Sequence, residues 1–103
     1  MPHMDRLSTY RTNVMATGDR LSVIYAETLI VEKVGDTITL DSGGWETVTT
    51  KRKMNQAARQ FALGYSVYQK DHKWFVVKPD GETVPFRDGI TFPRYAKEER
   101  NAA

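Results

Sequence analysis

The pattern of apolar and polar positions changes several times along the chain, and each change predicts an element. Residues 1–20 show no sustained period, so the sequence predicts an irregular N-terminal arm there. From Leu21 onward, alternating apolar residues followed by a run of branched side chains predict one extended segment reaching Val31. Residues 37–40 alternate cleanly and predict a second strand. Gly35 supplies the turn before it, since glycine tolerates the positive φ of a tight hairpin.

The clearest periodicity is helical and falls between residues 50 and 63. Apolar residues at the spacing i, i+3, i+4, i+7 and i+8 form one stripe, made of Met54, Ala57, Ala58, Phe61 and Ala62. Thr49 or Thr50 is expected to cap the helix, because a threonine hydroxyl accepts a hydrogen bond from an unpaired backbone amide. Gly64 is expected to end it in the left-handed conformation. A short extended piece at 45–48 leads into the helix.

Three short strands are predicted after the helix. Tyr65, Val67 and Tyr68 form one, and 74–77 forms its partner across a bend at 70–73. Residues 83–86 form another, which Pro85 places at an edge because proline cannot donate to a ladder. Residues 90–92 extend the pattern after the turn at Asp88-Gly89. The sequence therefore predicts an α+β fold, in which a small antiparallel sheet of about five short strands packs on one central amphipathic helix in the order β-β-(β)-α-β-β-β.

Length and composition favour one domain. The chain has 103 residues, of which 40% are hydrophobic and 27% charged, as in ordinary folded proteins. We assign the α+β domain to 21–93, the irregular arm to 1–20 and a charged C-terminal tail to 94–103, with 1–3 read as a cloning remnant. The chain has no cysteine, which excludes disulfides and zinc–thiolate sites. No apolar run approaches the roughly 20 residues that cross a bilayer, so we expect a cytoplasmic protein that contacts no membrane.

The sequence offers few residues that could form a catalytic site. His72 lies in a predicted hairpin bend and His3 in the suspected remnant, and the helix carries no acid that could pair with a metal-binding neighbour. The Gly43-Gly44 pair lacks the glycine and lysine spacing of a phosphate-binding loop. We therefore expect no enzyme activity, no catalytic residue, no metal and no cofactor.

The charge distribution points instead to binding. Residues 1–46 carry 7 acids and 4 bases, a balance of −3, whereas residues 47–79 carry 7 bases and 1 acid, a balance of +6. A basic middle third of this kind is typical of an anion-binding face. On a helical wheel Arg52, Gln56 and Arg59 lie opposite the apolar stripe, and these side-chain types contact phosphates and base edges. A solvated outer face would show the same composition.

The helix N-terminus adds a second indication. Lys51, Arg52 and Lys53 fall in the first turn of the predicted helix, where the dipole disfavours each cation by about 0.3–1 kcal/mol. An anion bound there would gain from the charges, the dipole and the free amides together. The same basic helix resembles the second helix of double-stranded-RNA-binding domains over about fourteen residues, from Thr50 to Leu63. The candidate nucleic-acid or anion-binding residues are Lys51, Arg52, Lys53, Gln56 and Arg59.

Aromatic residues beside this face offer possible stacking or ligand contacts. Trp45 precedes the helix, and Tyr68 lies in the strand that follows it. Aromatic side chains in short strands more often belong to the core or to cross-strand pairs, so only an exposed ring would serve a partner.

A composite of motifs over about half the chain resembles a family of small tailed-bacteriophage proteins of unassigned function. Its parts are Gly43-Gly44-Trp45-Glu46-Thr47-Val48-Thr49-Thr50-Lys51-Arg52, Met54-Asn55-Gln56-Ala57, Gly64-Tyr65, Val67-Tyr68-Gln69-Lys70-Asp71, Trp74-Phe75-Val76, Pro85-Phe86 and Asp88-Gly89-Ile90-Thr91-Phe92. The resemblance implies a phage accessory protein that acts in the cytoplasm of the infected bacterial host, and it implies no particular activity.

Three functions follow from these observations. The first is nucleic-acid binding through the basic helix face. The second is inhibition of a bacterial host or anti-phage defence protein, which would dock through the same face or through the sheet, since an acidic protein surface would also fit the basic helix. The third is sequestration of a phosphorylated small ligand between Trp45 and the helix N-terminus. An exposed strand, such as the one containing Pro85, could also pair with a second copy and form a homodimer.

Overall fold

The protein consists of one helix and two antiparallel sheets. The structure is a computed structural model, and it describes residues 11–44 and 46–94. The elements in chain order are β1 (Thr12–Thr17), β2 (Arg20–Tyr25), β3 (Thr28–Val34), β4 (Thr37–Leu40), α1 (Val48–Gln60), β5 (Ser66–Lys70), β6 (Lys73–Val77), β7 (Thr83–Pro85) and β8 (Ile90–Pro93). The strand orders are β1-β2-β3-β4-β8 and β5-β6-β7.

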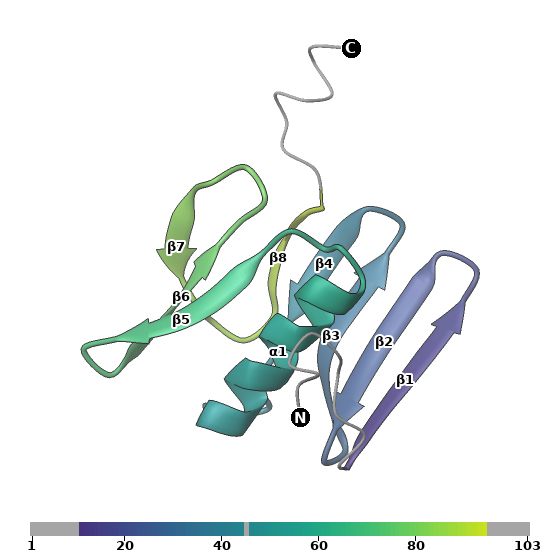
Figure 1. The fold of residues 1–103 in the computed structure, drawn as a ribbon, viewed down its shortest axis with the longest axis horizontal. Coiled ribbons are helices and arrows are strands. Elements are labelled where there is room, and N and C mark those ends of the chain that lie inside the picture. The colour runs from purple at the N-terminus through teal and green to yellow at the C-terminus, as the bar shows by residue number, and fades with distance from the viewer. Residues whose placement is uncertain (1–10, 45, 95–103) are drawn as a thin grey trace.

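The elements form two layers (Figure 1). The five-stranded sheet is one layer, and α1 lies across its inner face. The three-stranded sheet lies beside the helix, and β8 returns from it to pair with β4 in the first sheet. The predicted α+β class is confirmed, with eight strands in two sheets in place of about five in one.

The first strand departs from the sequence-based expectation. An irregular arm was predicted for 1–20, but β1 occupies Thr12–Thr17 and pairs along its whole length with β2. That prediction is wrong for this stretch, while residues 1–10 lie outside the described part of the chain. Pairing with β2 stabilises β1 as a strand, whereas the short and weakly alternating sequence of β1 does not predict one.

A tight turn divides the segment that was read as one strand from Leu21 to Val31. Ala26 and Glu27 form its two central residues, with φ of +50° and +73°. Two positive φ values at the tip of a two-residue hairpin define a type I′ turn, which normally carries asparagine or glycine. Alanine and glutamate are not typical of such a turn, so the sequence did not predict it.

A β-bulge in β3 places two adjacent side chains in the core. The register with β2 shifts between Val23 and Ile24, whose partners are Val31 and Leu29, so Ile30 has no opposite residue. Ile30 and Val31 are both buried as a result, at 1% and 0% exposure. The bulge explains the run of apolar residues where strict alternation would have required a polar one.

Both ends of α1 differ from the predicted positions. The N-cap is Thr47, whose hydroxyl accepts a hydrogen bond from the amide of Thr50 at 3.2 Å, so Thr49 and Thr50 lie inside the helix. At the other end the amide of Leu63 donates to the carbonyl of Ala58 at 2.9 Å, and Ala62 adopts the left-handed conformation with φ of +55°. This is a Schellman motif in which Ala62 takes the left-handed position that glycine usually occupies. Gly64 is also left-handed, but it follows the helix by several residues.

The core lies between the layers and draws on every part of the fold. Its largest fully buried side chains come from both sheets, the helix and the loop after it, and include Ile30, Ile38, Leu40, Met54, Leu63 and Val76. Met54, Ala57 and Ala58 of the predicted stripe are buried and Phe61 packs against the cluster, but Ala62 is exposed. The extended piece predicted at 45–48 is not a strand, since Glu46 and Thr47 form a loop and Val48 begins the helix.

Candidate nucleic-acid interface

The structure divides the five predicted helix residues into two groups. Arg52 and Arg59 are exposed on the side of α1 that faces away from the five-stranded sheet, and Lys51 is half-buried beside them. Lys53 and Gln56 are buried, with exposures of 3% and 6%. The buried arc of the helix is therefore wider than its apolar stripe and includes polar residues on one flank.

Lys53 is removed from the predicted face by its surroundings. Its ammonium nitrogen lies 5.4 Å from the centroid of the Tyr25 ring, a distance at which the ring's negative face attracts a cation. Burial lowers the pKa of Lys53, because the charged form loses solvation. This side chain contributes to the packing between α1 and β2.

The helix begins earlier than predicted, and this changes how its dipole acts on the basic residues. The helix begins at Val48, so Lys51, Arg52 and Lys53 lie in the second turn, and the prediction that they occupy the first is wrong. The amide of Lys51 already donates to the carbonyl of Thr47 at 3.1 Å. Because the dipole effect falls off within the first turn, these cations are not the destabilising feature that the sequence suggested.

A side-chain clamp joins the helix to the three-stranded sheet. The side-chain Nδ2 of Asn55 donates to the backbone carbonyl of Val67, and the backbone amide of Val67 donates to Oδ1 of Asn55, both at 2.8 Å. Asn55 thus takes the place of a neighbouring strand at the outer edge of β5. The helix and the three-stranded sheet consequently lie side by side as one outer layer (Figure 1).

The outward face of the three-stranded sheet carries an aromatic pair. Val67, Trp74 and Val76 point into the core, so the alternate residues Tyr68 and Phe75 point outward. Their rings are stacked at 5.5 Å with an interplanar angle of 24°, and Tyr68 remains 40% exposed. Tyr68 is therefore an exposed ring, whereas Trp45 lies outside the described residues.

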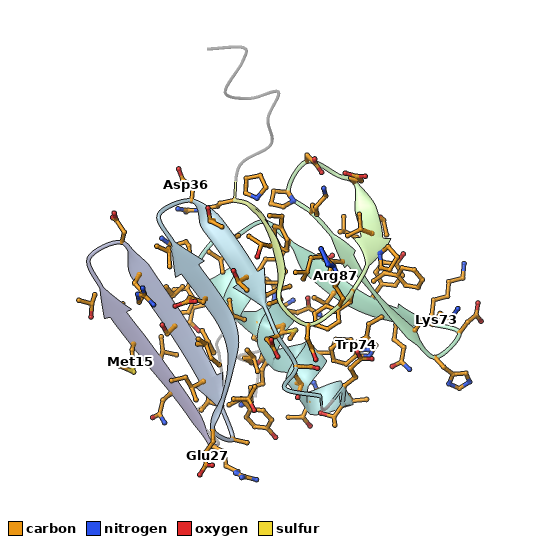
Figure 2. The ribbon with its side chains drawn as sticks, turned by 180° about the vertical axis from the view of Figure 1, so that it is seen from behind. Met15, Glu27, Asp36, Lys73, Trp74 and Arg87 are labelled. Carbon is orange, nitrogen blue, oxygen red and sulfur yellow. The ribbon has the colours of Figure 1, made fainter. Side chains whose placement is uncertain are left out.

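Basic residues that were not selected from the sequence flank this pair. Lys70 and Lys73 are exposed and opposite each other at the end of the β5–β6 hairpin, where Figure 2 labels Lys73. A hollow of about 380 Å³ lies at this end of the sheet, lined by Glu46, His72, Lys73, Trp74, Phe75, Pro85 and Phe86. The +6 balance of residues 47–79 could have identified these lysines, but only the pairing of β5 with β6 places them beside Tyr68.

The opposite side of the molecule has the opposite charge. Residues 11–44 carry 5 acids and 3 bases, a balance of −2. A hollow on this sheet is lined by Glu27, Thr28, Leu29, Glu32, Thr39 and Asp41. The charge asymmetry along the chain thus becomes an asymmetry between the two layers.

A separate pocket lies at the start of α1. It has a volume of about 310 Å³ and is lined by Arg11, Tyr25, Ala26, Thr28, Ile30, Ser42, Thr47 and Thr50. Hydroxyl groups dominate the lining, and Arg11 supplies a cation. Such a set of groups can hold a small anion.

Of the two histidines considered as catalytic candidates, His72 lies within the described part of the chain. His72 is exposed in the β5–β6 turn with φ of +66°. Within residues 11–44 and 46–94, no three His, Asp or Glu side chains gather as a metal site. The helix of the described chain is also neither long nor apolar enough to cross a membrane.

The comparison with protein families confirms the phage class that the sequence motifs indicated. Residues 2–93 match the family model described as Kyanoviridae Gp96 protein, so the chain belongs to this family of cyanophage proteins of unknown function. No curated protein and no solved structure matched the chain.

Proposed function

We propose that this protein is a non-catalytic phage accessory protein that binds nucleic acid through its outer layer, in the cytoplasm of the infected bacterium. The observation that carries the proposal is the clamp between Asn55 and Val67, which unites the basic helix and the aromatic sheet face in one surface. Phosphates would contact the cations of the layer, and bases would stack on the exposed ring.

The contacts divide by type across this surface. Arg52 and Arg59 offer forked guanidinium groups from the helix, and Lys70 and Lys73 offer mobile charges from the hairpin. Tyr68 offers a flat ring already held in place by Phe75. Lys51 contributes at the margin, whereas the buried Lys53 and Gln56 act by positioning the helix.

The decisive experiment measures binding of labelled DNA and RNA, single-stranded and duplex, at two salt concentrations. Wild type is compared with Arg52→Ala/Arg59→Ala, and with Tyr68→Ala. The matched control is Arg20→Ala/Arg87→Ala, which removes the same charge from β2 and from the β7–β8 loop. Loss of two phosphate contacts should weaken binding roughly uniformly across sequences and lower the slope of log K against log salt by about 2.

The three variants have separate expected outcomes. The helix double variant should lose most of the salt-dependent affinity, and the control should keep it. Tyr68→Ala should weaken single-strand binding by about 1–3 kcal/mol without changing the salt slope. Absence of binding by the folded wild-type protein at low salt would overturn the proposal and direct the search to an acidic bacterial protein as the target.

A second candidate function is supported by the pocket at the helix start. Arg11, Thr47 and Thr50 line a cavity of about 310 Å³ near the positive end of the helix dipole, which is large enough for a small phosphorylated ligand. The test is a thermal shift with inorganic phosphate and with mononucleotides, using Arg11→Ala for comparison. A ligand-dependent rise in Tm that disappears in the variant would support sequestration, and no shift at millimolar ligand would reject it.

A further inference from the structure

The four sheet edges of the described chain are protected to very different degrees. The edge at β7 is three residues long and ends in Pro85, and the edge at β8 is four residues long and ends in Pro93. At the edge formed by β5, the side chain of Asn55 in α1 bonds both backbone groups of Val67. Short strands, proline and coverage are the usual devices that prevent edge-to-edge pairing.

Within residues 11–44 and 46–94, none of these devices is found at the edge formed by β1. β1 is six residues long and carries neither a charge nor a proline, and its register with β2 is regular throughout. Residues 13–17 are exposed, including Val14 at 41% and Met15 at 58%. No strand within residues 11–44 or 46–94 pairs with its outer side. Figure 2 shows Met15 on this outermost strand of the five-stranded sheet.

The hairpin geometry determines which backbone groups face outward. Thr17 and Arg20 flank the two-residue turn at Gly18 and Asp19, so they form a hydrogen-bonded pair with each other. Alternation along the strand then directs the N–H and C=O groups of Val14 and Ala16 away from β2. These groups form a template for another antiparallel strand.

We propose that β1 pairs antiparallel with β1 of a second copy, with Met15 opposite Met15 across a two-fold axis. In this register Val14 of each copy exchanges backbone hydrogen bonds with Ala16 of the other. An uncharged strand can oppose itself without like-charge repulsion, and a two-fold contact needs one self-complementary patch.

Charge at the two ends of the strand selects this arrangement. Arg11 precedes β1 and Asp19 follows it, and both are exposed. Antiparallel pairing about Met15 brings Arg11 of each copy beside Asp19 of the other, whereas a parallel arrangement would bring like charges together.

The proposed dimer has a consequence for the rest of the molecule. The two-fold axis is perpendicular to the sheet, so the two sheets become one sheet of ten strands and both copies keep their outer layers on the same side. A dimer would therefore present two basic layers to one partner, although the pairing of β1 does not depend on what those layers bind.

The first test uses the absence of native cysteine. Met15→Cys in the full chain should form a covalent dimer on mild oxidation, because opposite residues of a non-hydrogen-bonded pair have Cα atoms about 4.5 Å apart, within disulfide range. Asn13→Cys is the matched control on the same face of the strand. Its two copies would lie roughly 13 Å apart, four residue rises, and should not cross-link.

The second test uses charge. Sedimentation velocity should show a concentration-dependent dimer for wild type and monomers for Met15→Lys and for Met15→Glu, each with unchanged circular dichroism. An equimolar mixture of the two variants should restore the dimer, because opposite charges then face each other. A wild-type protein that stays monomeric into the hundreds of micromolar range, or equal cross-linking of the two cysteine variants, would overturn the proposal.

Discussion

Single residues explain why the helix face is narrower than the sequence suggested. Polar residues in a helix are usually assigned to the solvent side, but Lys53, Gln56 and Thr50 are all buried. Each is long or small enough to place its polar atoms against a partner while its carbon atoms pack. Among the described residues no buried side-chain nitrogen or oxygen lacks a hydrogen-bond partner, so their burial leaves no such group unsatisfied.

Tyr65 provides a prediction at this scale. It is 4% exposed, and its hydroxyl donates to the carbonyl of Met54 at 2.7 Å. Burial raises its pKa above the ordinary value of 10.0, because the phenolate would lose solvation. Above pH 10 the unfolded chain therefore releases a proton that the folded chain retains, and stability should fall as pH rises.

The measurement is the urea midpoint of wild type and Tyr65→Phe as a function of pH. At pH 7 the variant should be less stable by about 1 kcal/mol, since one hydrogen bond is lost and the ring contact with Phe92 remains. Above pH 10 the stability of the variant should fall less steeply with pH than the stability of wild type. Parallel declines would show that the tyrosine does not control the alkaline limit.

Elements were predictable where their signals are local. Gly35 marked the β3–β4 turn, and Pro85 marked an edge strand, both as observed. The turn at Ala26 and Glu27 and the left-handed Ala62 carry no such marker, because the surrounding structure imposes a conformation that their side chains do not favour. Helix and hairpin boundaries were therefore the least accurate part of the prediction.

Asn55 provides a prediction at the scale of elements. Asn55→Ala removes both hydrogen bonds to Val67 and opens the outer edge of β5, so it should destabilise the protein by about 2 kcal/mol. Chemical denaturation measures the loss, and hydrogen exchange at the Val67 amide should accelerate more than at Val76. The exposed Arg52→Ala on the same helix should change stability by less than about 0.5 kcal/mol. Equal losses of stability from the two substitutions would show that Asn55 is not the link between helix and sheet.

The whole molecule shares one core in spite of its two sheets. Phe92 of the five-stranded sheet contacts Tyr65 just before β5, and Trp74 of the smaller sheet packs against Phe86 in the loop that leads to β8. Separate unfolding of either sheet would expose part of the same cluster. We therefore expect one cooperative transition.

Two probes test this expectation. Circular dichroism follows both sheets and the helix, while the fluorescence of the buried Trp74, in a Trp45→Phe background, follows the smaller sheet. The two urea midpoints should coincide. An earlier midpoint by fluorescence would mean that the three-stranded sheet unfolds alone and that the outer layer is a separable unit.

The sequence by itself determined the α+β class, the amphipathic helix, the edge position of Pro85 and the basic character of the middle third, because each depends on residues close together in the chain. It also indicated a phage protein through motifs that need no structure. Only the tertiary structure decided that Lys53 and Gln56 are buried and that Tyr68 and Phe75 form an outward pair. It alone placed Lys70 and Lys73 in the same layer as Arg52 and Arg59. Those facts depend on which strand neighbours which, and on a clamp between residues 55 and 67 that strand periodicity does not encode.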